Sequence, residues 1–295
     1  MGKVKSLSEW ITILKRKQWD YFGTAHFRDK KFEAETINPI PSFIEQRKIW
    51  AHFGVFVGYM IQKFFRDREI APETRIVDSS LIAEISLRLL KTYTEKKEVL
   101  MSRGVPVPSQ DVKELHNNGQ LWVASYKENA WRQAIKDAWL LSGLDLFYRG
   151  FIFPRTRPLN KEAVGQVTSF LERVLKWLKV EFSSVKTIYL NPKLNVSDLV
   201  WADADLIADD TLWDIKTTKY PEKAASSEVN LLLGYVSLTH YHIKKGLQKF
   251  PTIRAMGYLF PEQLTFWKRD LHDFGSRERE EMIKRIKTLV EEGAP

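Results

Sequence analysis

Two short segments, 199–207 and 211–217, constrain the fold of this chain most strongly. Both are mostly apolar, have the length of a strand and carry polar residues at alternate positions, which is typical of partly buried β-strands. Asp209-Asp210 stands between them, and aspartate favours tight turns. The pattern therefore predicts a β-hairpin with an acidic turn.

The charged residues of this hairpin fall on defined faces, because successive side chains of a strand point in opposite directions. Asp203 and Asp205 share one face of the first segment. Asp214 and Lys216 share one face of the second, with Ile215 on the other. A hairpin that brings Asp205 beside Asp214 makes a pocket of two carboxylates with an ammonium group at its edge.

Such a pocket favours a bound cation, because two carboxylates in a partly buried site repel each other. Magnesium is typically held by one or two carboxylates together with water and phosphate oxygens. We therefore expect Mg²⁺ or Mn²⁺ at Asp205 and Asp214. Hydrolysis of a phosphodiester bond is the chemistry that this site predicts.

Ordinary surface charge is the alternative interpretation of the acid–lysine spacing. The same spacing occurs at Asp29 and Lys31, at Glu95 and Lys97, and at Asp111 and Lys113. Those three pairs lie in polar or helix-like surroundings, without a preceding apolar strand that carries a second acid. The complete arrangement, and not the spacing, favours a metal site at Asp214.

Three stretches together resemble the PD-(D/E)xK nuclease superfamily, particularly its RecB-like branch, and are similar to uncharacterised bacterial members of it. They are Asn191-Pro192-Lys193-Leu194, Ala202-Asp203-Ala204-Asp205-Leu206-Ile207 and Asp214-Ile215-Lys216-Thr217-Thr218. The resemblance spans roughly Thr187 to Leu271, a minority of the chain. It implies an α/β fold with a restriction-endonuclease-like core, in which helices flank a mixed sheet.

The resemblance also implies roles for individual residues. The acids that match Asp205 and Asp214 bind the metal, together with the backbone carbonyl at the position of Ile215. The lysine that matches Lys216 positions the attacking water or stabilises developing charge. Lys219 and Lys223, just past this strand, are candidates for phosphate contact, with Lys219 the stronger.

Two positions depart from the family pattern. RecB-like members carry Gln-x-x-x-Tyr in the helix after the lysine strand, whereas this chain has Leu231 four residues before Tyr235. The family also places an acid or histidine in a helix before the first core strand. Glu162 and Glu172 are candidates, and an earlier helix offers Gly58 at the matching position. A catalytically inactive nuclease-fold subunit that binds nucleic acid or a protein partner is therefore the alternative.

Apolar periodicity predicts a helical region over 1–158. The resemblance implies that 159–295 forms a nuclease-like core with a closing helix. Expected helices cover 43–66, 81–90, 121–147 (one helix or a pair) and 161–178, followed by strand 187–190 and the acidic hairpin. A helix over 227–243, a hairpin of 255–260 with 264–268, and a helix over 276–291 complete the chain.

Composition narrows the setting. The chain has 295 residues, a net charge of +9 and no cysteine. A basic balance favours a polyanionic partner, and we expect nucleic acid, in particular DNA. The absence of cysteine excludes disulfides and cysteine nucleophiles, and apolar stretches such as 53–61 are too short to cross a bilayer. We expect a cytoplasmic protein with no membrane contact, open to a protein partner or to homo-oligomerisation.

Other motifs are weaker evidence for function. His240 and His242 are two residues apart, whereas helical ligands of one metal usually lie four apart, so a surface or core role is favoured. No GxxxxGK[ST] or GxGxxG loop occurs, which argues against ATP-driven activity in this chain.

Overall fold

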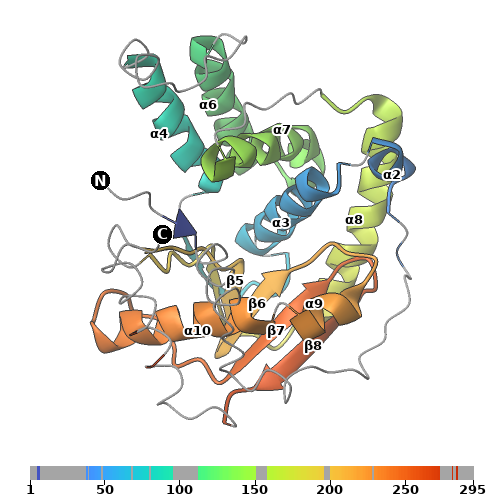
Figure 1. Cartoon of the computed structure of the whole chain (residues 1–295). Coiled ribbons are helices and arrows are strands. Elements are labelled where there is room, and N and C mark those ends of the chain that lie inside the picture. The colour runs from blue at the N-terminus through green and yellow to red at the C-terminus, as the bar shows by residue number, and fades with distance from the viewer. Residues whose placement is uncertain are drawn as a thin grey trace. The chain divides into compact units, whose positions relative to one another are not determined.

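The structure is a computed structural model, and Figure 1 shows the ribbon. It describes residues 5–6, 38, 40–47, 49–67, 69–79, 81–95, 112–150, 158–195, 200–227, 229–272, 281 and 284. The chain forms two compact units, each assembled from separate segments. Unit 1 comprises Met1–Ile37, Glu73–Ser79 and Ser184–Pro295, and unit 2 comprises Asn38–Pro72 and Ser80–Ser183.

Unit 1 is built on a six-stranded mixed sheet. Its strands, in spatial order, are β2 (Arg75–Asp78), β3 (Thr187–Leu190), β5 (Leu206–Ala208), β6 (Thr211–Ile215), β7 (Ala255–Phe260) and β8 (Thr265–Asp270). The pairs β2–β3 and β6–β7 are parallel, and the other neighbours are antiparallel. A separate parallel pair joins β1 (Lys5–Ser6) to β4 (Val200–Trp201).

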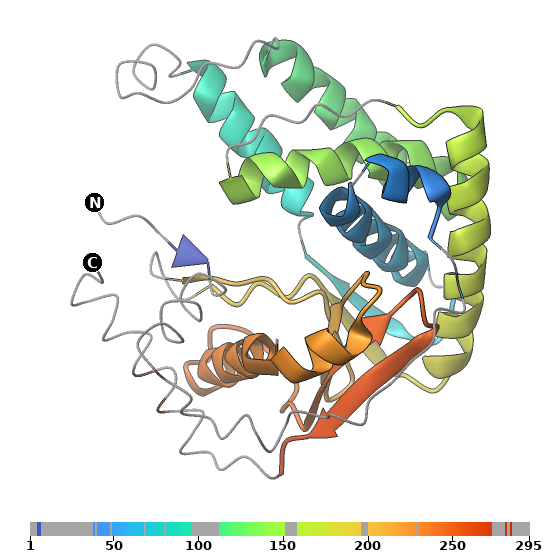
Figure 2. The ribbon, with the colours of Figure 1, turned by 45° about the vertical axis from the view of Figure 1, so that its right-hand side comes forward.

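Two helices of unit 1 cover the sheet: α10 (Val229–Lys244) packs against β6 and β7, and α9 (Pro221–Ser227) packs against β7 (Figure 2). Leu232, Leu233 and Val236 of α10 belong to one buried cluster with Leu212 of β6 and Tyr258 of β7. Side chains two apart share a face of a strand, so Leu212 marks the helix-covered face of β6 as the face of Asp214 and Lys216.

Unit 2 is helical. Its helices are α2 (Ser42–Arg47), α3 (Trp50–Arg66), α4 (Ile82–Glu95), α6 (Val112–Glu128), α7 (Trp131–Gly150) and α8 (Lys161–Glu181). Helix α8 begins at a cap, because the Asn160 side chain accepts the backbone N–H of Ala163 at 2.8 Å. Within the unit, the Tyr59 hydroxyl donates to Asp145 at 2.8 Å and links α3 to α7.

The α/β class, the mixed sheet and the helical segments agree with the expectation from sequence. Several boundaries differ. The expected helix 227–243 corresponds to α10, and α9 before it was not expected. The segment 121–147 belongs to a pair of helices, α6 and α7, which is one of the two alternatives expected, but α6 begins earlier, at Val112. Strand β2 was not expected at all. Of the expected closing helix 276–291, the structure describes only residues 281 and 284.

The compact units also follow a different division from the expected 1–158 and 159–295. Helix α8 belongs to the helical unit, whereas β2 belongs to the sheet of unit 1. The reason is hydrogen bonding: β2 lies parallel to β3, with Arg75 opposite Thr187 and Asp78 opposite Leu190. A four-residue strand inside a helical region carries too little periodicity to be recognised from sequence.

Candidate active site

The acidic hairpin forms, but its first strand is shorter than the expected 199–207: only β5 pairs with β6, whereas Val200–Trp201 pairs with β1. Strands β5 and β6 are antiparallel, with Leu206 opposite Trp213 and Ala208 opposite Thr211. Continuing this register by one position places Asp205 opposite Asp214. Paired residues of an antiparallel ladder project from the same face, so the two acids lie on one side of the sheet, at the open end of the hairpin.

The turn of the hairpin is fixed by its own acid. Asp209 has a positive φ of 49°, which aspartate tolerates better than most residues. Its carboxylate accepts the backbone N–H of Thr187 at 2.9 Å and that of Lys186 at 3.1 Å. These bonds attach the turn to the start of β3. Asp209 therefore stabilises the turn, as its position predicted, at the end of the hairpin opposite to Asp205 and Asp214.

Asp205 is joined directly to the lysine strand. Its Oδ2 accepts the backbone N–H of Ile215 at 2.6 Å, just beyond the end of β5. The carboxylate thus replaces the ladder bond that a longer β5 would supply. The next residue, Lys216, donates its backbone N–H to Leu259 of β7 at 2.9 Å. Backbone groups alternate between the two neighbours of a strand, so the Ile215 carbonyl is directed to the side of Asp205.

Asp214 and Lys216 form a charge pair on this face. Lys216 Nζ lies 3.0 Å from Asp214 Oδ2. Asp214 is 6% exposed, and its Oδ2 accepts no well-aligned hydrogen bond despite this short distance. The ammonium also lies 5.8 Å from the centre of the Tyr258 ring, within reach of a cation–π attraction. A buried carboxylate oxygen that is held only by charge can accept another cationic partner.

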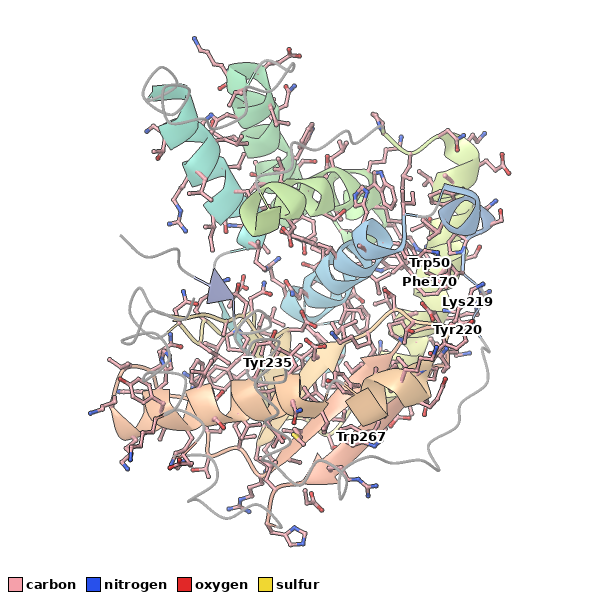
Figure 3. All side chains as sticks on the ribbon, viewed as in Figure 1. Trp50, Phe170, Lys219, Tyr220, Tyr235 and Trp267 are labelled. Atoms are coloured by element: carbon pink, nitrogen blue, oxygen red, sulfur yellow. The ribbon has the colours of Figure 1, made fainter. Side chains whose placement is uncertain are left out.

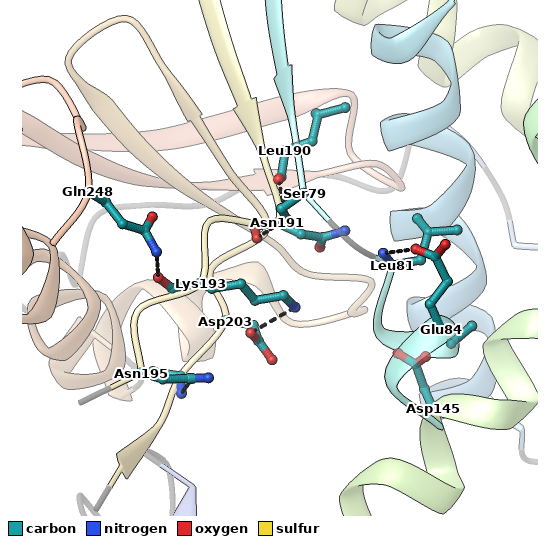
Figure 4. A network of polar contacts seen from close by, with 12 residues as sticks. Ser79, Leu81, Glu84, Asp145, Leu190, Asn191, Lys193, Asn195, Asp203 and Gln248 are labelled. Carbon is teal, nitrogen blue, oxygen red and sulfur yellow. Dashed lines mark hydrogen bonds and ion pairs between the residues drawn. The ribbon is translucent and has the colours of Figure 1, made fainter. Parts of the chain in front are cut away.

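Asp203 is held by a different partner. Its Oδ1 lies 3.0 Å from Lys193 Nζ (Figure 4). The backbones of the two residues also pair in an isolated antiparallel β-bridge. Gln248 donates to the Lys193 carbonyl at 2.9 Å and fixes the segment that carries this lysine. The Asn191-Pro192-Lys193-Leu194 stretch therefore lies along the acid strand, and its lysine neutralises Asp203.

Asn191 explains the sharp bend of this stretch. It is buried, has a positive φ of 47°, and donates its backbone N–H to the Asp205 carbonyl at 3.0 Å. The Ser79 hydroxyl, from the residue after β2, donates to the carbonyl groups of Leu190 and Asn191 (Figure 4). The strand that the sequence analysis missed thus supports the backbone beside Asp205.

These residues fit a divalent metal site of low ligand count. No cluster of three or more histidine, aspartate or glutamate side chains placed to hold a metal occurs in the part of the chain that the structure describes. The available oxygens are the carboxylates of Asp205 and Asp214 and the Ile215 carbonyl. Magnesium accepts such a set because water and phosphate oxygens complete its coordination.

The turn of the expected hairpin 255–268 lies next to this site and, unlike an ordinary surface turn, is buried. Glu262 and Gln263 connect β7 to β8 and are 0% and 1% exposed. Gln263 donates its side-chain N–H to the Thr218 carbonyl at 3.0 Å. Both carboxylate oxygens of Glu262 are buried without an aligned hydrogen bond. Burial raises the pKa of Glu262 to about 7, although Gln263, Thr218 and Lys219 oppose this rise. Pro261-Glu262-Gln263 has the composition of a surface turn, so the sequence predicts the turn but not its burial.

The remaining candidate residues belong to several elements of the two units. Lys219 is exposed after β6, and Lys223 lies on α9 with its Nζ 4.2 Å from the Tyr220 ring centre. His242 Nε2 donates to the Asn195 carbonyl at 2.9 Å, and burial lowers the pKa of this histidine. In unit 2, Glu172 pairs with Arg132 at 2.7 Å and Glu162 is exposed. Leu231, at the position of the family glutamine, packs against the core of unit 1.

Comparison with known proteins gives no assignment: no family model matches the chain, and neither a curated protein nor a solved structure does. Within the described ranges, no helix has the length and apolar character needed to cross a membrane.

Proposed function

We propose that this protein is a metal-dependent nuclease of the PD-(D/E)xK type that hydrolyses phosphodiester bonds in DNA. The observation that carries the proposal is the arrangement at the open end of the β5–β6 hairpin. Asp205 bonds to the backbone of Ile215 at 2.6 Å, and Asp214 lies 3.0 Å from Lys216 on the same strand. Two acids and a lysine on one sheet face, at the end of a hairpin, are the parts that such a reaction needs.

Each residue has a distinct role in the proposal. Asp205, Asp214 and the Ile215 carbonyl hold Mg²⁺ or Mn²⁺. A divalent ion lowers the pKa of a bound water and offsets phosphate charge. Lys216 orients the attacking water or stabilises the charge that develops on the phosphate. The partly buried position of Lys216, with 25% of its side chain exposed, lets it serve both Asp214 and a substrate.

A cleavage assay with a charge-neutral variant tests the proposal. The purified full-length protein is incubated with plasmid, linear duplex, single-stranded DNA and RNA in Mg²⁺, Mn²⁺ or EDTA. We expect metal-dependent cleavage that Asp214→Asn abolishes, because this change removes a charge with little change in volume. Cleavage by Asp214→Asn at the wild-type rate would refute the assignment.

A nuclease-fold subunit without catalytic activity is the second candidate. It is favoured by the packing of Leu231 against the core at the position where the family has glutamine. This candidate predicts nucleic-acid or protein binding without cleavage. Thermal unfolding separates the two candidates. A competent site binds Mn²⁺ only in the folded protein, so added Mn²⁺ raises the melting temperature.

A further inference from the structure

The segment that leaves the lysine strand exposes an aromatic ring and positive charge. Tyr220 follows β6 by five residues and is 54% exposed, and Lys219 beside it is exposed as well (Figure 3). A single exposed aromatic residue is common on protein surfaces.

The ring of Tyr220 is held by local contacts. Its backbone N–H donates to Thr218 Oγ1 at 3.1 Å, and its carbonyl accepts the N–H of Lys223 at 3.0 Å. The Lys223 ammonium lies 4.2 Å from the centre of the ring. A cation over one face of an exposed ring is the combination that proteins use to bind single strands, in which a base stacks on the ring and the cation contacts phosphate.

The backbone at the start of this segment is held by a hydrogen bond at Thr218. The Thr218 carbonyl accepts a hydrogen bond from Gln263, which is 1% exposed in the turn between β7 and β8. The backbone that carries Lys219 and Tyr220 is therefore fixed while their side chains project. A platform that is already ordered loses little conformational entropy when a ligand binds.

Chain length limits the distance from this platform to the candidate site. Tyr220 lies four positions after Lys216. An extended chain spans at most about 3.6 Å per residue, so their Cα atoms lie no more than about 14 Å apart. This distance corresponds to about four stacked bases at 3.4 Å each. A strand bound at Tyr220 is thus within reach of Asp214.

We propose that Lys219, Tyr220 and Lys223 bind single-stranded nucleic acid, with a base stacked on Tyr220 and phosphates contacted by the two lysines. The proposal rests on the proposed nuclease function for the position of its substrate, and it adds a strand preference. Bases in a duplex already stack on their neighbours, so a stacking platform favours an unpaired strand.

The test measures binding apart from cleavage. Full-length Asp214→Asn protein in EDTA is titrated into a fluorescein-labelled oligothymidylate and, separately, into a labelled duplex of the same length. Tyr220→Ala in this background should weaken single-strand binding about 5- to 100-fold, the range measured for loss of one stacking residue. Tyr220→Phe, which keeps the ring, should change it less than about twofold.

Lys245→Ala is the matched control for charge, since Lys245 is exposed at the end of α10 and lies outside the proposed surface. Lys223→Ala should weaken binding more than Lys245→Ala, and circular dichroism melting should show all variants folded. Equal binding by Tyr220→Ala and Tyr220→Phe, equal losses on duplex and single strand, or no binding by the Asp214→Asn protein overturns the proposal. Cleavage by wild type with normal binding by Tyr220→Ala rejects the platform alone. Ring-dependent binding without cleavage rejects the nuclease alone.

Discussion

Asp205 Oδ2 accepts the backbone N–H of Ile215 at 2.6 Å, so one candidate metal ligand also completes the hydrogen bonding of the lysine strand. The same carboxylate therefore has a structural role and a proposed catalytic role. Substitutions that keep or remove its hydrogen-bond acceptor separate the two.

The first prediction concerns Asp205. Asp205→Asn keeps an oxygen acceptor for Ile215 but removes the charge, and it should abolish cleavage with little effect on stability. Asp205→Ala leaves the N–H without its partner and should also lower the free energy of unfolding by about 1–3 kcal/mol. Urea denaturation of both variants measures the difference. If Asp205→Ala proves as stable as Asp205→Asn, the hydrogen bond to Ile215 does not contribute to the free energy of unfolding.

Asp203 provides the matched control for this prediction. It lies on the same segment, two residues before Asp205, but its carboxylate faces Lys193 at 3.0 Å. Asp203→Asn should retain cleavage within a few fold and should change stability by less than about 1 kcal/mol, since the pair is partly exposed. Loss of cleavage in Asp203→Asn would instead add this acid to the metal site.

The second prediction concerns the pair of Asp214 and Lys216. Lys216→Met removes the ammonium that lies 3.0 Å from a carboxylate whose residue is 6% exposed. The remaining charge is then uncompensated, so the metal-free variant should be destabilised by about 1–3 kcal/mol. Divalent metal should restore part of this stability, and more than it adds to wild type. Melting temperatures in EDTA and in Mn²⁺ test this; an equal gain in both proteins would contradict it.

The third prediction concerns pH. Burial raises the pKa of Glu262 from 4.5 to about 7, so between these values the folded protein keeps a proton that the unfolded chain releases. Stability should therefore be lost as the pH rises from about 4.5 to about 7. Glu262→Gln removes this loss and should be up to about 3 kcal/mol more stable than wild type at pH 8.

Glu73→Gln is the control for the pH prediction, because Glu73 is exposed in the same unit. Free energies of unfolding are measured by denaturant titration at pH 4, 6 and 8. The advantage of Glu262→Gln over wild type should grow with pH, whereas Glu73→Gln should follow wild type. A constant difference at all three pH values would show that Glu262 does not titrate in this range.

The parts of the site that sequence predicts are local, and the parts that it misses are not. Asp205, Asp214 and Lys216 follow from alternation along two strands and from the acidic turn between them. The bond from Gln263 to Thr218 joins residues 45 apart, and no local pattern records it. The same holds for β2, whose place depends on pairing with β3 more than a hundred positions later. Tertiary contact decides burial, so a polar turn such as Glu262-Gln263 has the sequence of a surface loop.

The last prediction tests the sheet beneath the site. Gly257 lies opposite Trp213 in the β6–β7 pair, and a Cβ at this position would lie 2.5 Å from Trp213 Cζ3 and 2.5 Å from the Trp267 carbonyl oxygen. The backbone oxygen cannot move without disturbing β8, so Gly257→Ala should cost about 1–3 kcal/mol.

Gly165 supplies the contrast for Gly257, since it lies inside α8 and an added Cβ there would have no neighbour within 4 Å. Gly165→Ala should stabilise the protein by about 0.5–1 kcal/mol, because alanine loses less backbone entropy in a helix. Denaturant unfolding should show that the two variants change the free energy of unfolding in opposite directions. A neutral Gly257→Ala would contradict this prediction and would mean that the Trp213 ring and the backbone of β8 have room to move.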